Sequence, residues 1–136
     1  MKKSIALYSF GHHYADSYPV APQKNTCQIV LDLRMLDDPY RYGFEESGLE
    51  KKVAEFAIKQ NKKFFSSLTP FLTVLIDRFC GNDRYDAFNI FFGCYGGWQR
   101  SVAAAEYFKN WLKIHYPDIA LSVKHLAIGR HSFSPP

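Results

Sequence analysis

The sequence predicts an α/β domain of three layers, in which helices cover both faces of a mainly parallel sheet of about four strands. Four short apolar segments, rich in β-branched and aromatic residues, have the character of buried strands. Three longer segments carry apolar residues at helical spacing, and the predicted order is strand, loop, strand, two helices, strand, helix, strand. With 136 residues and a hydrophobic fraction of 47%, the chain is long enough for one domain, residues 1–136, with a substantial core.

The strands are predicted from apolar runs with turn residues at their ends. Gly11 ends the first run, and the polar segment 12–26 that follows contains Pro19 and Pro22, which indicate a loop. The second and third runs are apolar without alternation, as expected of strands that are buried on both faces. The predicted strands are residues 3–10, 28–35, 87–92 and 120–125.

The helices are predicted from a 3.6-residue apolar period and from their capping residues. Ser66 or Ser67 can cap the second helix, with Pro70 in its first turn, and Gly81 ends it. Pro117 ends the third helix. The predicted helices are residues 49–64, 66 or 67 to 80, and 100–115.

One glycine-rich segment, residues 93–101, joins the third predicted strand to the third predicted helix. Its glycines allow a tight turn, and the helix start adds unpaired N–H groups and the positive end of the helix dipole. Arg100 adds a planar guanidinium that can donate to two phosphate oxygens, and Ser101 adds a hydroxyl. This combination predicts a phosphate site rather than a simple turn. Its members are Gly93, Cys94, Tyr95, Gly96, Gly97, Trp98, Gln99, Arg100 and Ser101.

Further polar residues are expected near this loop, because ligands of such sheets bind beyond the carboxyl ends of the strands. Asp32 and Arg34 are two residues apart on a predicted strand and therefore face the same way, either as an internal ion pair or as part of the pocket. His13 lies in the loop after the first strand and is included in the site. His12 precedes it, and adjacent side chains point apart, so no shared metal site is expected.

Composition excludes several classes of protein. The cysteine count of 3 is odd and no Cys-x-x-Cys pair occurs, so neither a disulfide framework nor a zinc site is predicted. The net charge of +4 tolerates an anionic partner without requiring one. No membrane span, secretory signal or cofactor motif is recognised, and we expect a cytoplasmic protein whose tail, residues 131–136, is frayed.

Several motifs in matching order resemble the C-terminal domain of the RapZ family of RNase adapter proteins. Residues 9–14 resemble its Ser-Phe-Gly-x-Lys-Tyr opening, and residues 32–40 resemble its Asp-x-Arg-x-Leu-x-Asn-Pro-Tyr segment. Residues 47–53 resemble its Thr-Gly-x-Asp-x-x-Val, and residues 93–102 resemble its Gly-Cys-Thr-Gly-Gly-x-His-Arg-Ser-Val loop. The resemblance covers nearly the whole chain.

This resemblance implies a non-catalytic binding or sensor domain. The family's domain binds glucosamine 6-phosphate and small regulatory RNAs and self-associates, so the resemblance implies phosphate at the loop, with Asp32 and Arg34 lining the same pocket. Tyr95 stands in place of the loop threonine, Trp98 and Gln99 in place of a polar residue and histidine, and His13 in place of lysine. These changes alter the sugar side of the pocket. The basic tail associated with RNA contact is missing, which weighs against RNA binding.

A second, local resemblance suggests an alternative. Cys94 and Arg100 bracket five residues, as in the Cys-x5-Arg loop of cysteine-dependent phosphatases. A thiolate there could attack phosphorus, with Asp32, Asp37 or Asp38 as general acid. Those enzymes usually have histidine before the cysteine, where Gly93 stands, so the binding function is preferred.

Overall fold

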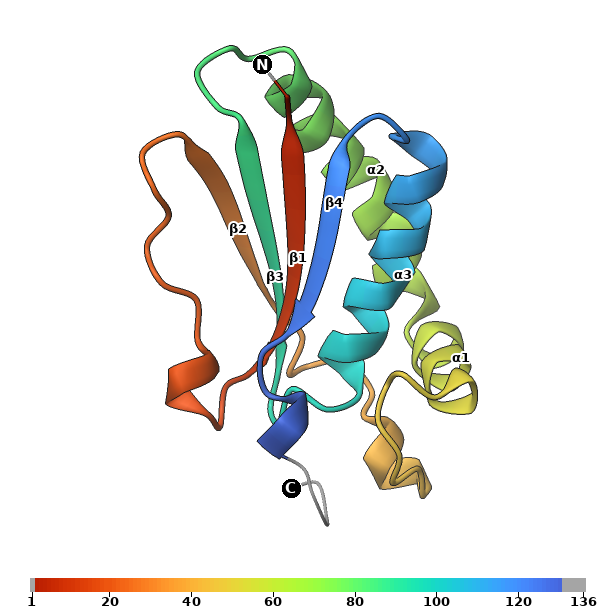
Figure 1. Ribbon diagram of the computed structural model, residues 1–136. Helices are drawn as coiled ribbons and strands as arrows, with labels where there is room; N and C mark the ends of the chain where they lie inside the picture. Colours follow the sequence, from red (N-terminus) through yellow and green to blue (C-terminus); the bar gives the residue numbers. More distant parts are fainter. Residues whose placement is uncertain (1, 131–136) are drawn as a thin grey trace.

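Four parallel strands form the sheet at the centre of this computed structural model, which describes residues 2–130 (Figure 1). The strands are β1 (Ser4–Gly11), β2 (Thr26–Asp32), β3 (Ala87–Cys94) and β4 (Ala120–His125). Their order across the sheet is β2-β3-β1-β4, with every pair parallel. The predicted α/β class and the four-strand parallel sheet are therefore confirmed.

Three strand ends differ from the prediction near the glycine-rich loop. β1 includes Gly11 instead of ending at residue 10. β2 ends at Asp32 instead of residue 35, because the Asp32 carboxylate accepts a hydrogen bond from the Arg34 amide at 3.0 Å and turns the chain. β3 continues past residue 92, since Gly93 and Cys94 pair with the end of β1. The carboxyl ends of three strands consequently lie together at one edge, as expected.

Three α-helices connect the strands: α1 (Lys51–Gln60), α2 (Lys62–Cys80) and α3 (Arg100–His115). The bounds of α3 match the prediction. The break between α1 and α2 was predicted near residue 66 but lies at Asn61, whose side chain bonds both the amide (2.8 Å) and the carbonyl (3.1 Å) of Asp37. Such a tertiary contact leaves no local pattern in the sequence.

Pro70 lies inside α2 instead of in its first turn. Proline has no N–H to donate to the carbonyl four residues earlier. That carbonyl belongs to Ser66, and the Thr69 hydroxyl donates to it at 3.5 Å. The Thr69 hydroxyl thus replaces part of the hydrogen bond that Pro70 cannot donate, and the helix continues through Pro70.

The prediction of helices on both sheet faces is wrong. Buried residues of α2 and α3 share one core with alternate residues of the strands, all on the same face (Figure 1). Connections between parallel strands are right-handed, so the direction of a connection across the sheet decides which face it covers. The β2–β3 and β3–β4 connections run in the same direction and place their helices on one face, whereas the β1–β2 connection runs in the opposite direction and covers the other face. The β1–β2 connection contains Pro19 and Pro22 and forms only the short 3₁₀ helix η1 (Ala15–Ser17).

Within residues 2–130, no helix is long and apolar enough to cross a membrane. The predicted fraying of residues 131–136 falls outside the residues that the structure describes.

Candidate functional site

The glycine-rich loop lies tightly against the end of β1. Gly97 has a φ of +65°, and a Cβ there would approach the Gly11 amide nitrogen to 2.8 Å and the Ala127 Cβ to 2.7 Å. A Cβ on Gly93 would lie 2.2 Å from the Phe10 ring. Only glycine fits these two positions, so the close approach of the two chain segments depends on them.

The loop ends in the first turn of α3, and its amides precede the bonded helix. The first intrahelical bond runs from Ala103 N–H to the Gln99 carbonyl at 2.9 Å. The N–H groups of Arg100 and Ser101 therefore have no carbonyl four residues before them within the helix. Together with the helix dipole, they make this end of α3 attractive to an anion.

Arg100 is placed at the base of the site, with only 7% of its surface exposed. Its Nη1 donates to the carbonyls of Arg34 (2.8 Å) and Leu36 (3.1 Å), just beyond β2. Its Nη2 lies 3.6 Å from Asp38 Oδ2. The guanidinium thus holds the chain after β2 against the start of α3, and a bound anion would compete with Asp38 for Nη2.

A recess of about 30 Å³ lies beside the Arg100 guanidinium, above the ~10–15 Å³ that one water molecule requires. All loop residues from Cys94 to Arg100 except Gly97 line it, together with Asp38 and Tyr40. Tyr95, Arg100, Asp38 and Tyr40 also line a wider cleft of about 810 Å³, so the two spaces meet. Sequence reasoning gave Asp38 only as a general-acid alternative and left Tyr40 out of the site, because neither residue carries a local signal of ligand binding.

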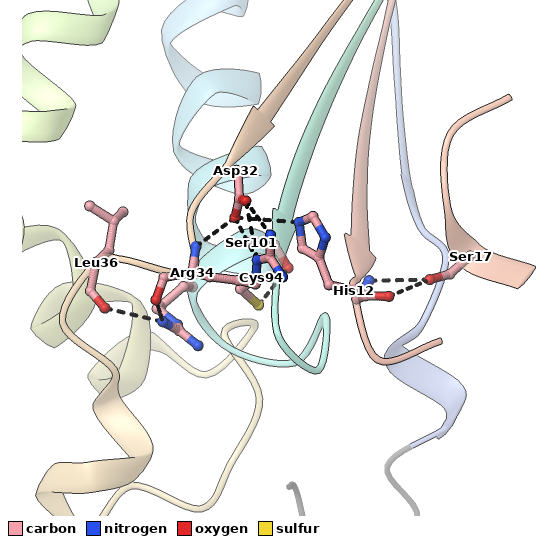
Figure 2. Close-up of polar contacts among 9 residues, drawn as sticks. His12, Ser17, Asp32, Arg34, Leu36, Cys94 and Ser101 are labelled. Carbon is pink, nitrogen blue, oxygen red and sulfur yellow. Dashed lines mark hydrogen bonds and ion pairs between the residues drawn. The ribbon is translucent and has the colours of Figure 1, made fainter. Parts of the chain in front are cut away.

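Asp32 and Arg34 form the ion pair that their spacing suggested (Figure 2). Arg34 Nη2 lies 2.6 Å from Asp32 Oδ2. The hydrogen bond from Arg34 lowers the pKa of Asp32 to about 2, despite the opposing effect of burial. Arg34 also lines the wider cleft. Arg34 thus takes part in an ion pair that is about half exposed, and it borders the wider cleft but not the recess at the loop.

The two adjacent histidines have different surroundings. His12 Nε2 lies 3.4 Å from Asp32 Oδ1 but makes no hydrogen bond within the described part of the chain (Figure 2). Burial lowers the pKa of His12, the Asp32 carboxylate opposes this and Arg34 adds to it. His13 stacks on Tyr95 with ring centroids 5.0 Å apart, and its Nδ1 lies 3.0 Å from the Tyr95 hydroxyl.

The remaining loop side chains are used to hold neighbouring segments. Gln99, only 3% exposed, donates to the carbonyls of Phe44 (2.8 Å) and Glu46 (2.7 Å). Trp98 Nε1 donates to the Glu45 carbonyl at 3.0 Å. These bonds fix the segment before α1 against the loop, a role that the sequence did not indicate.

Cys94 and Ser101 face each other beneath the loop. Both are buried, and the Cys94 thiol donates to the Ser101 hydroxyl oxygen at 3.2 Å (Figure 2). His125, at the end of β4, bonds Ser9 Oγ at 2.6 Å and Glu106 Oε2 at 2.8 Å, on the helix side of the sheet. His125 therefore does not belong to the recess.

The fold and the loop define an α/β domain whose conspicuous feature is a glycine-rich turn between a buried strand and a helix. The family model described as the RapZ C-terminal domain matches residues 3–129, and the chain belongs to this family. The resemblance stated from the motifs is confirmed over nearly the whole chain.

Bacterial proteins named "nucleotide-binding protein" are similar to this chain. One from Oleidesulfovibrio alaskensis is 29% identical over 132 residues, covering 92% of this chain and 41% of the relative. One from Bacillus cytotoxicus is 30% identical over 125 residues, covering 89% and 39%. One from Gloeobacter violaceus is 40% identical over 107 residues, covering 76% and 36%. The chain thus spans about two fifths of the length of these relatives.

Proposed function

We propose that this chain is a non-catalytic binding domain for a phosphorylated small metabolite, with the phosphate in the recess of the glycine-rich loop. The observation that carries the proposal is the buried Arg100 guanidinium, which lines the same recess as the loop before α3. A buried cation next to helix N–H groups favours a dianion over a neutral ligand. Ser101 and the backbone from Tyr95 to Trp98 complete the proposed phosphate site.

Membership of the RapZ C-terminal domain family supports the same function and makes glucosamine 6-phosphate the first ligand to test. Asp32, Arg34 and His13 are proposed to face the part of the ligand beyond the phosphate. The name "nucleotide-binding protein" belongs to relatives more than twice as long as this chain, and it makes nucleotides a second group to test.

Isothermal titration with inorganic phosphate, glucosamine 6-phosphate and glucosamine tests the proposal. We expect binding of the two phosphate compounds and none of glucosamine. Arg100→Lys should weaken that binding at least about tenfold, because an ammonium cannot replace the planar fork. The matched control is Arg78→Gln, which removes an exposed arginine of α2 outside the site. If neither phosphate compound binds the folded wild-type chain, the proposal is wrong.

The phosphatase alternative has less support from the site. The hydrogen bond from Arg34 lowers the pKa of Asp32 to about 2, which disfavours Asp32 as a general acid and leaves Asp37 or Asp38 for that role. The Cys94 thiol is buried and donates to Ser101. A generic phosphate ester assay decides the matter, since turnover that Cys94→Ser abolishes would favour the enzyme.

RNA binding and self-association remain predictions from the family resemblance. RNA binding would give an affinity that falls steeply with salt, because phosphate contacts release counterions. No retardation of structured RNA at low salt would remove it. Analytical ultracentrifugation would measure self-association.

A further inference from the structure

An aromatic side chain stands at the mouth of the recess. Tyr95 is 44% exposed and lines both the recess and the wider cleft. One side of its ring stacks on His13, with an angle of 28° between the ring planes, and its hydroxyl is bonded to the same histidine. The Tyr95 ring is therefore held in one orientation while much of its surface remains open to a ligand.

A second aromatic ring borders the same two spaces. Tyr40 is 37% exposed and belongs to the 3₁₀ helix η2 (Pro39–Tyr42), whose start is capped by the Asp38 carboxylate at 3.1 Å from the Tyr40 amide. Tyr42, 54% exposed, lines the cleft farther out. The recess beside Arg100 thus opens into a space bordered by tyrosine rings, in contrast to the apolar core on the other side of the loop.

The size and the lining of the cleft indicate what extends from the phosphate. Small-molecule sites commonly measure about 300–1,000 Å³, and this cleft, at about 810 Å³, lies in the upper part of that range and leaves room for a group beyond the phosphate. Partly exposed tyrosines offer flat faces on which planar heterocycles stack. Three arginines line the cleft (Arg34, Arg41 and Arg100) against two aspartates (Asp37 and Asp38), so its lining has a small excess of positive charge that suits an anionic ligand.

We infer that the ligand carries a planar heterocycle, and that the site accepts a nucleoside 5′-monophosphate with its phosphate at Arg100 and its base on the Tyr95 ring. This inference rests on the proposed phosphate site and adds the class of ligand. His13 acts as a positioning residue, because it fixes the ring of Tyr95 without having to touch the ligand.

The test compares four probes by isothermal titration: inorganic phosphate, ribose 5-phosphate, glucose 6-phosphate and the set of common nucleoside 5′-monophosphates. At least one nucleotide should bind about fivefold or more tightly than ribose 5-phosphate, the lower end of what stacking of a base on an aromatic ring contributes. Tyr95→Leu should remove that advantage, measured as the ratio of nucleotide affinity to inorganic phosphate affinity within the same variant. Tyr95→Phe and Tyr95→Trp should retain it.

The controls separate this inference from the phosphate site itself. Phe71→Ala removes another exposed aromatic ring, on α2, and should change no affinity. His13→Ala should reduce the nucleotide advantage only in part, because the Tyr95 ring remains but is no longer held. Failure of every probe, phosphate included, would refute the phosphate site. Binding of ribose or glucose phosphate as tightly as any nucleotide, or an unchanged advantage in Tyr95→Leu, would overturn the inference alone.

Discussion

Replacement of Gly97 by alanine tests the packing of the loop against β1. The residue has a φ of +65°, and an alanine Cβ would lie 2.7–2.9 Å from the Ala127 Cβ, the Gly11 nitrogen and the Phe10 carbonyl carbon. The left-handed conformation costs about 1–2 kcal/mol for alanine, and the overlap with backbone atoms adds roughly 1–3 kcal/mol. We expect a total loss of about 2–5 kcal/mol, a large part of the ~5–15 kcal/mol stability of a domain.

Gly43 provides a matched control for the conformational contribution. Its φ is +95°, but an alanine Cβ at this position would have no atom within 4 Å outside its own chain neighbours. Gly43→Ala should therefore lose only about 1–2 kcal/mol. Gly81, with a φ of −87° and a nearest contact of 3.6 Å, should tolerate alanine without loss.

Equilibrium unfolding in urea measures the free energy of unfolding of the three variants and the wild type. The expected order of destabilisation is Gly97→Ala, then Gly43→Ala, then Gly81→Ala. Phosphate titration of folded Gly97→Ala should show weakened binding as well, since the loop must move away from β1. If Gly97→Ala is no less stable than Gly43→Ala, the close approach of the loop to β1 is not as described.

Three further predictions concern the side chains around the loop. Arg100→Gln should lower the free energy of unfolding by about 2–4 kcal/mol, measured in urea, because the partly buried carbonyls of Arg34 and Leu36 lose a charged donor. Gln99→Leu should cost about 1–3 kcal/mol and speed hydrogen exchange at the Gly48 amide, which bonds the Trp98 carbonyl. Arg34→Gln should raise the pKa of Asp32 from about 2 towards 3.8, and it should also raise the pKa of His12. NMR titration of the two side chains measures both changes. An unchanged Asp32 titration would contradict the ion pair.

The sign of the pH effect follows from the lowered pKa of Asp32. A carboxyl group with a depressed pKa in the folded state stabilises the protein above its unfolded pKa and loses that contribution as the pH falls through the folded value. The wild type should therefore lose the contribution of Asp32 between about pH 4 and pH 2. Arg34→Gln should show less of this loss. Because the pair is about half exposed, its total contribution is small.

Much of the fold and of the loop could be predicted from local patterns. The bounds of α3 follow from its apolar period and from Pro117, and they agree with residues 100–115. The contact of Asp32 with Arg34 was expected from their spacing, but it forms in the turn after β2 and not along one strand face, because β2 ends at Asp32. Asn61 shows the limit, because its bonds to Asp37 reach 24 residues along the chain and no periodicity marks them.

By itself the sequence determined the order of strands and helices, the family, and the place of the glycine-rich loop between a buried strand and a helix, because each depends on neighbouring residues along the chain. Only the tertiary structure decided that the helices share one face of the sheet, that Arg100 donates to the carbonyls of Arg34 and Leu36, and that Tyr40 and Tyr95 border one space. Those features depend on the order of strands in the sheet, which brings segments more than 50 residues apart into contact at its carboxyl edge.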